Sequence, residues 1–267
     1  MTAKVTADQE VLSVPEEIWE PPAPPTDLVF DDGEPLESNR HRIAMNVLID
    51  SVLTALAERT DFFVGGNMFV YYSRSQAMNR DFRGPDFFVA LDVDGSRERQ
   101  GWVTWEEEGR YPDVIVELMS PSTAKIDKGI KKQLYERTFR TREYYIYDPF
   151  DSQSLEGWQL DATQQYQPLI ANEHGWLWCE SLELWLGTWE GSIRREPPTE
   201  TCQWLRFYDR QERLVLLPEE IAIQEQQRAE QERQRAEQER QRAEQERQRA
   251  EKLAERLQAA GINPDEE

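Results

Sequence analysis

The sequence predicts an α/β fold with a central mixed sheet of about four strands, on three observations. A strand–helix–strand unit spans residues 111–149, where the apolar run 113–119 leads through a turn to a basic helix predicted from about 128 to 139. Aromatic runs alternate with turn residues from 154 to 217, which is typical of added antiparallel strands. A charged seven-residue repeat at 227–250 predicts a long helix outside this sheet.

Composition is consistent with one globular domain plus an appendage. Hydrophobic residues make up 38% of the 267 positions and include nine Trp, enough for one sizeable core. The two cysteines, Cys179 and Cys202, are too few for a disulfide scaffold or a cysteine zinc site. The first twenty residues are acidic and include Pro15, unlike a signal peptide, and no apolar run approaches membrane-spanning length. We therefore expect a cytoplasmic protein in a reducing compartment.

The charge distribution separates an acidic body from one basic stretch. The net charge of −21 argues against a protein that coats nucleic acid, because nonspecific DNA binding depends on neutralising phosphates. Residues 1–218 alone have a net charge of −16. The densest positive cluster within them consists of Lys125, Lys128, Lys131, Lys132, Arg137, Arg140 and Arg142. A polyanion such as DNA would approach the body at this cluster.

Three segments are expected along the chain. Residues 1–36 are acidic and rich in Pro, and such a composition buries too little apolar surface to become ordered unaided, so they are predicted to form a mobile arm. Residues 37–217 are predicted to form the folded domain. Residues 218–267 are predicted to form the charged helix.

The folded domain is predicted to begin with a helix and a short β-structure. Apolar residues recur at helical spacing over 37–58, with Ser38 or Asn39 as the cap. Residues 62–72 are predicted to form a hairpin or a bulged strand. The next strand is expected over 85–91.

The C-terminal repeat, QRAEQER in tandem, indicates a solitary charged helix or a weak coiled coil. Ala229 and its successors every seven residues mark one heptad position, but the position three residues later is Glu until Leu253. A seam with Glu at this position packs poorly. Pairs such as Arg228–Glu232 at i,i+4 favour a solitary helix, with only its Leu253 and Leu257 end pairing weakly. A partner could bind through this helix.

Two carboxylates stand in otherwise apolar strands. Asp86 precedes the run Phe87–Leu91, and Glu117 interrupts the run Asp113–Met119. Adjacent strands would bring Asp86 and Glu117 within a few ångströms of each other, where two like charges are stable only around a cation. Their carboxylate oxygens suit a hard ion such as Mg²⁺ (or Mn²⁺).

The helix that follows is predicted to offer a lysine to this pair. Asp127 is expected to cap the helix. Ile130 and Leu134 lie four residues apart on one face, which we expect to pack, while Lys131 and Tyr135 lie on the adjacent face. A metal ion with a nearby ammonium is a minimal site for phosphodiester hydrolysis, because both stabilise the developing negative charge.

These residues resemble the PD-(D/E)XK nuclease superfamily, and more closely its Uma-type restriction endonuclease family, which is abundant in cyanobacteria. The similarity lies in Gly84-Pro85-Asp86, in residues 112–123, in Asp127-x-Gly129-x-Lys131-x-x-x-Tyr135, and in Glu143-Tyr144 leading to Asp148-Pro149, over about 37–190. The resemblance implies a restriction-endonuclease-like core in the order αβββαβ and metal-dependent endonucleolytic cleavage of DNA. A homodimer is expected by the same analogy.

The resemblance also implies roles for individual residues. Asp86 and Glu117 would ligate the metal together with the carbonyl of Leu118, and Lys131 would be the catalytic lysine. The superfamily lysine stands two residues after the acid, where this chain has Met119, so Lys131 would replace it from the helix. The expected supporting residues are Glu37, His41, Asp113 and Tyr135, and the expected nucleic-acid contacts are Lys125, Lys128, Lys132 and Arg137.

Other interpretations remain open for the site and for the whole chain. Glu117 could face solvent at a sheet edge, Asp86 could cap a turn after Pro85, and Lys131 could be an ordinary solvated lysine. Asp113 shares a strand face with Glu117 and could replace Asp86 as a ligand. A nuclease-like domain without catalysis, serving as a binding or scaffolding module through its C-terminal helix, is the alternative function.

Overall fold

A mixed six-stranded sheet is the centre of the computed structural model, which describes residues 25–30, 38–79, 81 and 83–259. Its strands lie in the order β1 (Phe62–Gly65), β3 (Phe87–Leu91), β5 (Val114–Leu118), β6 (Glu143–Asp148), β7 (Asp151–Leu160) and β8 (Tyr166–Pro168). The β5–β6 pair is parallel and the other pairs are antiparallel. The sheet is therefore mixed, as predicted, and it has more strands than the four expected.

Two smaller sheets and several helices complete the fold. One sheet has the order β11 (Cys202–Tyr208), β10 (Leu184–Gly191) and β9 (Leu177–Cys179), and the other pairs β2 (Val70–Tyr71) with β4 (Trp102–Val103). The helices are α1 (Asn39–Ala55), α2 (Arg74–Met78), the short η1 (Thr104–Glu106) and α5 (Pro218–Ala259). A further helical segment joins β5 to β6 through α3 (Ala124–Ile126), η2 (Asp127–Lys131), α4 (Lys132–Leu134) and η3 (Tyr135–Phe139).

The order of the central elements matches the predicted αβββαβ core. It runs from α1 through β1, β3 and β5 to the helical segment 124–139 and then to β6. The added antiparallel strands expected after residue 154 are present as β8 to β11 together with most of β7. Among the described helices, none is long and apolar enough to cross a membrane.

Alternation along the strands gives the central sheet two buried faces. Phe87, Val89, Val114 and Val116 pack with α1 and the β9–β11 sheet, while their neighbours, such as Phe88 and Ile115, pack with the helical segment 124–139. Because successive strand side chains point to opposite faces, Phe88 and Ala90 of β3 share the face beneath the helical segment with Ile115 and Glu117 of β5. All five residues of each of these strands are buried.

The prediction of a hairpin or a bulged strand at residues 62–72 is wrong. β1 pairs antiparallel with β3, whereas β2 pairs parallel with β4, so the two strands leave Gly65-Gly66 in different directions. The chain bends where Gly66 passes the backbone of Asp86, and a Cβ on Gly66 would lie 2.5 Å from the Asp86 carbonyl oxygen. Only glycine fits this approach, which links the bend to the start of β3.

The helical segment 124–139 also differs from its prediction in two details. It begins near Ala124, so Asp127 does not cap it but lies within it at φ −65° and ψ −47°. Ile130 is 64% exposed rather than packed, because π-helical turns at η2 and η3 widen the helix and shift its buried face onto Tyr135 and Phe139. The segment ends at Phe139 as predicted, where Arg140 adopts a left-handed conformation.

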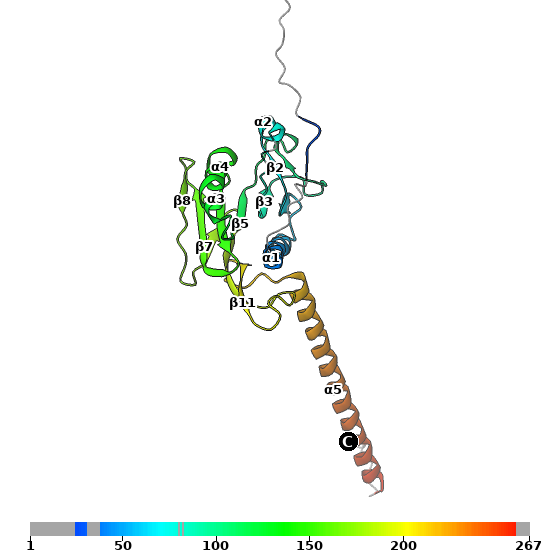
Figure 1. Cartoon of the computed structure of the whole chain (residues 1–267). Coiled ribbons are helices and arrows are strands. Elements are labelled where there is room, and N and C mark those ends of the chain that lie inside the picture. The colour runs from blue at the N-terminus through cyan, green and yellow to red at the C-terminus, as the bar shows by residue number, and fades with distance from the viewer. Residues whose placement is uncertain (1–24, 31–37, 80, 82, 260–267) are drawn as a thin grey trace, which may run out of the picture.

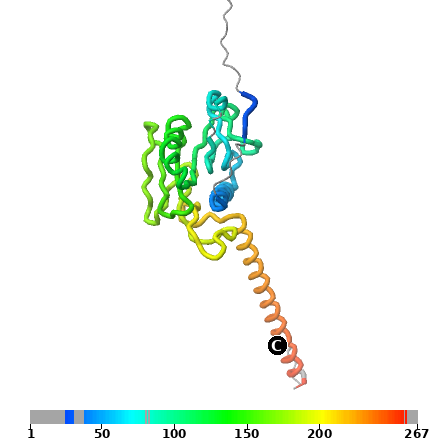
Figure 2. Tube along the Cα trace, viewed as in Figure 1, coloured from blue at the N-terminus to red at the C-terminus, as the bar shows by residue number. Residues whose placement is uncertain are grey.

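The charged repeat forms α5, a helix that projects from the body as a rod (Figure 1). The tube trace shows the helix leaving the body directly after the β11 region (Figure 2). The predicted pair of Arg228 and Glu232 is formed, with 3.3 Å between Nε and Oε1. The first turn is anchored by Glu220, whose Oε2 lies 2.7 Å from the buried Nη2 of Arg206 and also accepts the Leu217 amide at 2.7 Å.

Removing this anchor should destabilise the folded body. Glu220→Ala leaves the Arg206 guanidinium buried without its carboxylate, and we expect a loss of about 2 kcal/mol in unfolding free energy, moderated by the partial exposure of Glu220. Glu225→Ala, an exposed position on the same helix, is the matched control. Chemical denaturation measures both, and equal stability of the two variants would contradict the anchoring role.

Candidate active site

The strand register places the two predicted carboxylates opposite each other. β3 and β5 pair with Phe87 opposite Val116, and one further step in this antiparallel register puts Asp86 opposite Glu117. Both lie on the sheet face that Phe88 and Ile115 share with the helical segment. Directly opposed side chains in an antiparallel pair have Cβ atoms about 5 Å apart, so the two carboxylates are neighbours.

Asp86 is tied to the end of β5 through the backbone. Its Oδ2 accepts a hydrogen bond from the Leu118 amide at 2.7 Å. Burial raises the pKa of Asp86, and the Lys131 charge and the Leu118 amide oppose that rise. Leu118 thus meets the site through its amide, while the predicted contact between its carbonyl and a metal remains a prediction.

Glu117 is completely buried and has a partner on each oxygen. Oε2 accepts a hydrogen bond from Lys131 Nζ at 2.9 Å, and Oε1 accepts one from the Tyr135 hydroxyl at 2.7 Å. Burial raises the pKa of Glu117 to about 7, against the opposing effect of Lys131 and with a further rise from the charge of Asp86. The structure therefore brings Glu117, Lys131 and Tyr135 together, and the solvent-facing interpretation of Glu117 is wrong.

Lys131 lies between two buried carboxylates. Its Nζ is 2.9 Å from Glu117 Oε2 and 2.9 Å from Asp127 Oδ1. Burial lowers the pKa of Lys131, but the charges of Glu117, Asp127 and Asp86 together raise it above its usual value, so the ammonium stays protonated. Lys131 is thus not a solvated surface lysine; its side chain is 20% exposed.

Asp127 is a member of this cluster that sequence analysis assigned to a cap. It is 1% exposed, and burial followed by the Glu117 charge raises its pKa. The available signal was its spacing, because a residue four positions before Lys131 on a helix shares that lysine's face.

The other predicted supporting residues lie elsewhere or act through the backbone. Asp113 sits at the opposite end of β5, where its Oδ2 accepts the Leu91 amide at 2.8 Å and its carboxylate lies 3.5 Å from Arg142, so it does not join Asp86. His41 is buried, and its Nε2 lies 3.1 Å from the Met119 carbonyl oxygen, which links α1 to the end of β5. Glu37 falls outside the described residues.

The predicted nucleic-acid contacts have different surroundings. Lys125 and Arg137 are exposed, and Arg137 lies 3.8 Å from Glu136. Lys128 forms an ion pair with Glu156 at 2.7 Å. Lys132 lies 3.8 Å from the centre of the Trp158 ring, and burial lowers its pKa.

The donor set near Asp86 and Glu117 fits a hard divalent ion. Over the described residues, no group of three or more His, Cys, Asp or Glu side chains has an arrangement suited to a metal. Mg²⁺, however, is commonly held by one or two carboxylates and completes its shell with water and substrate oxygens. Glu117 is buried and Asp86 is half-buried, and burial raises the pKa of both, so the pair has the chemistry that such a cation would satisfy.

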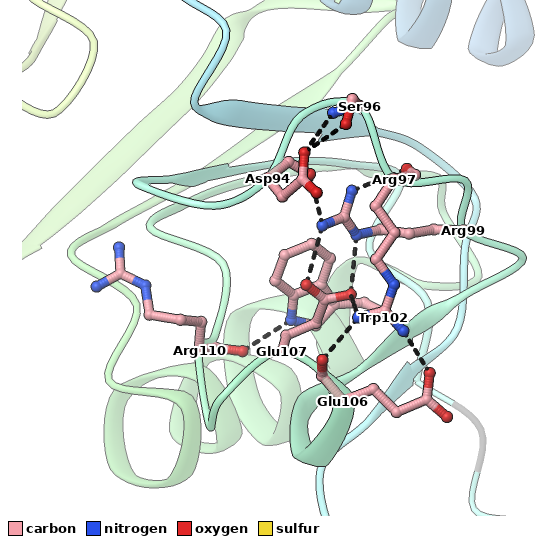
Figure 3. A network of polar contacts seen from close by, with 8 residues as sticks. All are labelled: Asp94, Ser96, Arg97, Arg99, Trp102, Glu106, Glu107 and Arg110. Carbon is pink, nitrogen blue, oxygen red and sulfur yellow. Dashed lines mark hydrogen bonds and ion pairs between the residues drawn. The ribbon is translucent and has the colours of Figure 1, made fainter.

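A second polar network lies far from this pair, in the loop between β3 and β5 (Figure 3). Arg99 Nε donates to Glu107 Oε1 at 2.9 Å, and Arg97 Nη2 donates to Glu106 Oε2 at 2.9 Å. The Arg99 guanidinium also lies 5.2 Å from the Trp102 ring centre. Because this loop joins the end of β3 to the start of β5, it is at the opposite end of both strands from Asp86 and Glu117.

Comparisons with known proteins relate the chain to nucleases. The model of the Uma2 family, described as "Putative restriction endonuclease", matches residues 14–190. A solved structure described as a putative nuclease belonging to DUF820, from Anabaena variabilis, is 14% identical with a TM-score of 0.40. That match covers 60% of this chain and 86% of the other. No curated protein sequence matches the chain.

The raised pKa of Glu117 predicts how stability changes with pH in metal-free protein. Between pH about 4.5 and about 7 the folded state retains a proton that the unfolded state has lost, so the free energy of unfolding should fall as pH rises, by about 3 kcal/mol. Glu117→Gln removes this titration and should flatten the profile. Denaturation at pH 5 and pH 8 measures both, and parallel profiles would contradict a raised pKa at Glu117.

Proposed function

We propose that this chain, which belongs to the Uma2 family, is a metal-dependent endonuclease that hydrolyses DNA phosphodiester bonds. The observation that supports this most is the cluster of Asp86, Glu117 and Lys131, in which two opposed strand carboxylates lie beside one half-buried ammonium. Perturbed carboxylates beside a specific charged partner are typical of functional sites. The family match supports nuclease chemistry in general.

The proposed chemistry assigns one task to each side chain. A divalent ion bound by Asp86 and Glu117 would polarise the scissile phosphoryl group and lower the pKa of an attacking water. Lys131 would offset the negative charge that develops on the phosphorane-like transition state and orient the water. Tyr135 would keep Glu117 in its rotamer through the 2.7 Å hydrogen bond, and its own pKa is raised by burial, so the phenol remains a donor.

The position of Lys131 supports its proposed role as the relocated lysine. Met119, two residues after Glu117, is an apolar residue, 3% exposed, and cannot supply an ammonium. The helix instead brings Lys131 Nζ within hydrogen-bond distance of Glu117. A lysine on the helical segment 124–139 can therefore contact Glu117 in place of a lysine two residues after it in the chain.

The proposed DNA-binding surface is the helical segment 124–139. Lys125, Lys128 and Arg137 are exposed there on an otherwise acidic protein. Lys131 lies on the same segment, so phosphates neutralised by the exposed residues would be brought next to the carboxylate pair. Lys132 is held against Trp158 and is the weaker candidate for a phosphate contact.

A binding or scaffolding module without catalysis is the alternative. It is favoured by α5, whose surface is exposed over most of its 42 residues and resembles that of a spacer. It leaves unexplained why Asp86, Glu117 and Lys131 converge in a buried cluster. A protein that binds a partner through residues 219–259 but binds no metal would favour the module.

Cleavage of supercoiled plasmid with Mg²⁺ or Mn²⁺ at low salt tests the proposed function. Asp86→Ala, Glu117→Ala and Lys131→Ala should each reduce nicking by about 100-fold or more, because each removes a group that stabilises the transition state. Lys252→Ala on α5 is the matched control and should cleave like the wild type. Absence of cleavage by the folded wild-type protein on several DNA types would overturn the endonuclease proposal.

The salt dependence of DNA binding tests the proposed surface. Lys125→Gln or Arg137→Gln should weaken binding regardless of sequence and reduce the slope of log K against log salt by about 1, as expected for one lost phosphate contact. Fluorescence anisotropy with a labelled duplex over a salt series gives this slope. Slopes identical to the wild type in both variants would place the DNA elsewhere.

A further inference from the structure

We propose that Asp127 is a positioning residue for Lys131, a second anchor that holds the lysine ammonium in the site when Glu117 is engaged by a cation. This inference rests on the proposed function for its purpose, but the anchor itself is a property of the metal-free protein. The family resemblance includes Asp127 in its motif but implies no function for it.

The contact geometry supports an anchor dedicated to this lysine. Asp127 Oδ1 lies 2.9 Å from Lys131 Nζ, and Asp127 is 1% exposed. Lys131 is the cation within ion-pair distance of this oxygen among the described residues, and a hydrogen bond with the Thr123 side chain also lowers the pKa of Asp127, so both contacts offset its burial. An uncompensated buried carboxylate is costly, which gives the pair a reason to persist.

Hydrogen bonds of its backbone groups fix the position of Asp127, whose side chain holds Lys131. The Asp127 amide donates to the Thr123 carbonyl at 3.0 Å, and the Tyr144 hydroxyl donates to the Asp127 carbonyl at 3.0 Å. Tyr144 belongs to β6 of the central sheet. Asp127 and Lys131 are the two ends of one π-helical turn, so any movement of the helix carries both together.

The Lys131 ammonium is shared between the carboxylates of Glu117 and Asp127, and this sharing explains why a second anchor is needed. A divalent ion held by Asp86 and Glu117 would repel the ammonium and would compete with Lys131 for the Glu117 carboxylate. With Asp127 present, the ammonium keeps one carboxylate 2.9 Å away and remains beside the reacting phosphate. Without Asp127, Lys131 must either compete with the ion for Glu117 or turn toward solvent, which already reaches 20% of its side chain.

Glu117 itself does not depend on Lys131 for its orientation. The Tyr135 hydroxyl donates to Oε1, so the carboxylate keeps its position when Asp127 alone holds Lys131. Tyr135 and Asp127 therefore have parallel tasks: Tyr135 secures the carboxylate and Asp127 secures the ammonium. A divalent ion would then bind without displacing either the Glu117 carboxylate or the Lys131 ammonium.

Chemical labelling of Lys131 in metal-free, full-length protein tests the anchor. The acetylation rate of Lys131 is measured by peptide mass spectrometry in wild type, Glu117→Gln, Asp127→Asn and the double variant, with Lys125 as the exposed internal standard. We expect Glu117→Gln to stay within about 3-fold of the wild-type rate, because Asp127 still holds the ammonium, and the double variant to react at least about 10-fold faster. Asp113→Asn, a buried carboxylate at the other end of β5, is the matched control and should leave Lys131 protected.

Two outcomes would overturn the inference. Labelling of Lys131 in Glu117→Gln as fast as Lys125 would show that Glu117 is the only anchor. Equal rates in Glu117→Gln and the double variant would show that Asp127 adds nothing. Asp127→Ser serves as a second variant if Asp127→Asn does not fold, and circular dichroism checks folding in every case.

Mn²⁺ titration by calorimetry then separates this inference from the proposed function. Asp127→Asn should weaken Mn²⁺ binding about 5-fold in the presence of Lys131 and have no effect in a Lys131→Met background, because the competing ammonium is gone. A 5-fold loss in both backgrounds would indicate a merely structural role and overturn the inference. Failure of the wild type to bind Mn²⁺ would count against the proposed function, while the labelling result on metal-free protein would still decide the anchor.

Discussion

The antiparallel register between β3 and β5 is the constraint on which the candidate site depends. It sets Asp86 opposite Glu117 on one face of the sheet, and a slip of either strand by one residue would turn that strand's carboxylate to the other face. Gly66 passes close to the Asp86 backbone and leaves no room for a side chain, so β1 and β3 meet at a fixed place. The site is thus a consequence of sheet geometry, to which the helix between β5 and β6 adds its lysine.

Electrostatics make this arrangement costly unless charges are matched. Asp86, Glu117 and Asp127 lie close together, and burial raises the pKa of each. Lys131 supplies one positive charge against these three carboxyl groups. A cluster that is short of positive charge inside an apolar core does not favour stability, and such imbalance is expected where binding of a cation or a reaction compensates for it.

Much of the fold was accessible to sequence analysis because its signals are local. The strand at Val114–Leu118, the end of the following helix at Phe139 and the long charged helix all follow from hydrophobic pattern and composition. The prediction of a hairpin or a bulged strand at 62–72 was wrong because the two glycines indicate that the chain turns, but not which strand it pairs with after the turn. The packing of Ile130 was wrong because π-helical turns rotate side chains away from the positions that a regular helix predicts.

The candidate site shows the same division between local and long-range information. The sequence predicts that Asp86 and Glu117 meet if their strands are adjacent, and the resemblance supports that adjacency, which spacing alone cannot establish. The sequence predicts a cap at Asp127 because Asp is common at helix starts, whereas the burial of Asp127 depends on how the helix lies against the sheet. Asp113 accepts the Leu91 amide instead, because it lies at the end of β5 opposite to Glu117 and cannot reach Asp86.

The location of a bound divalent ion tests whether Asp86 and Glu117 form a metal site. Crystals grown or soaked with Mn²⁺ would locate the ion by its anomalous scattering, independently of any assay of cleavage. We predict a single strong peak coordinated by carboxylate oxygens of Asp86 and Glu117, with the Lys131 ammonium beside Asp127. A map with no peak there at saturating Mn²⁺, or with the ion bound only in the loop between β3 and β5, would contradict it.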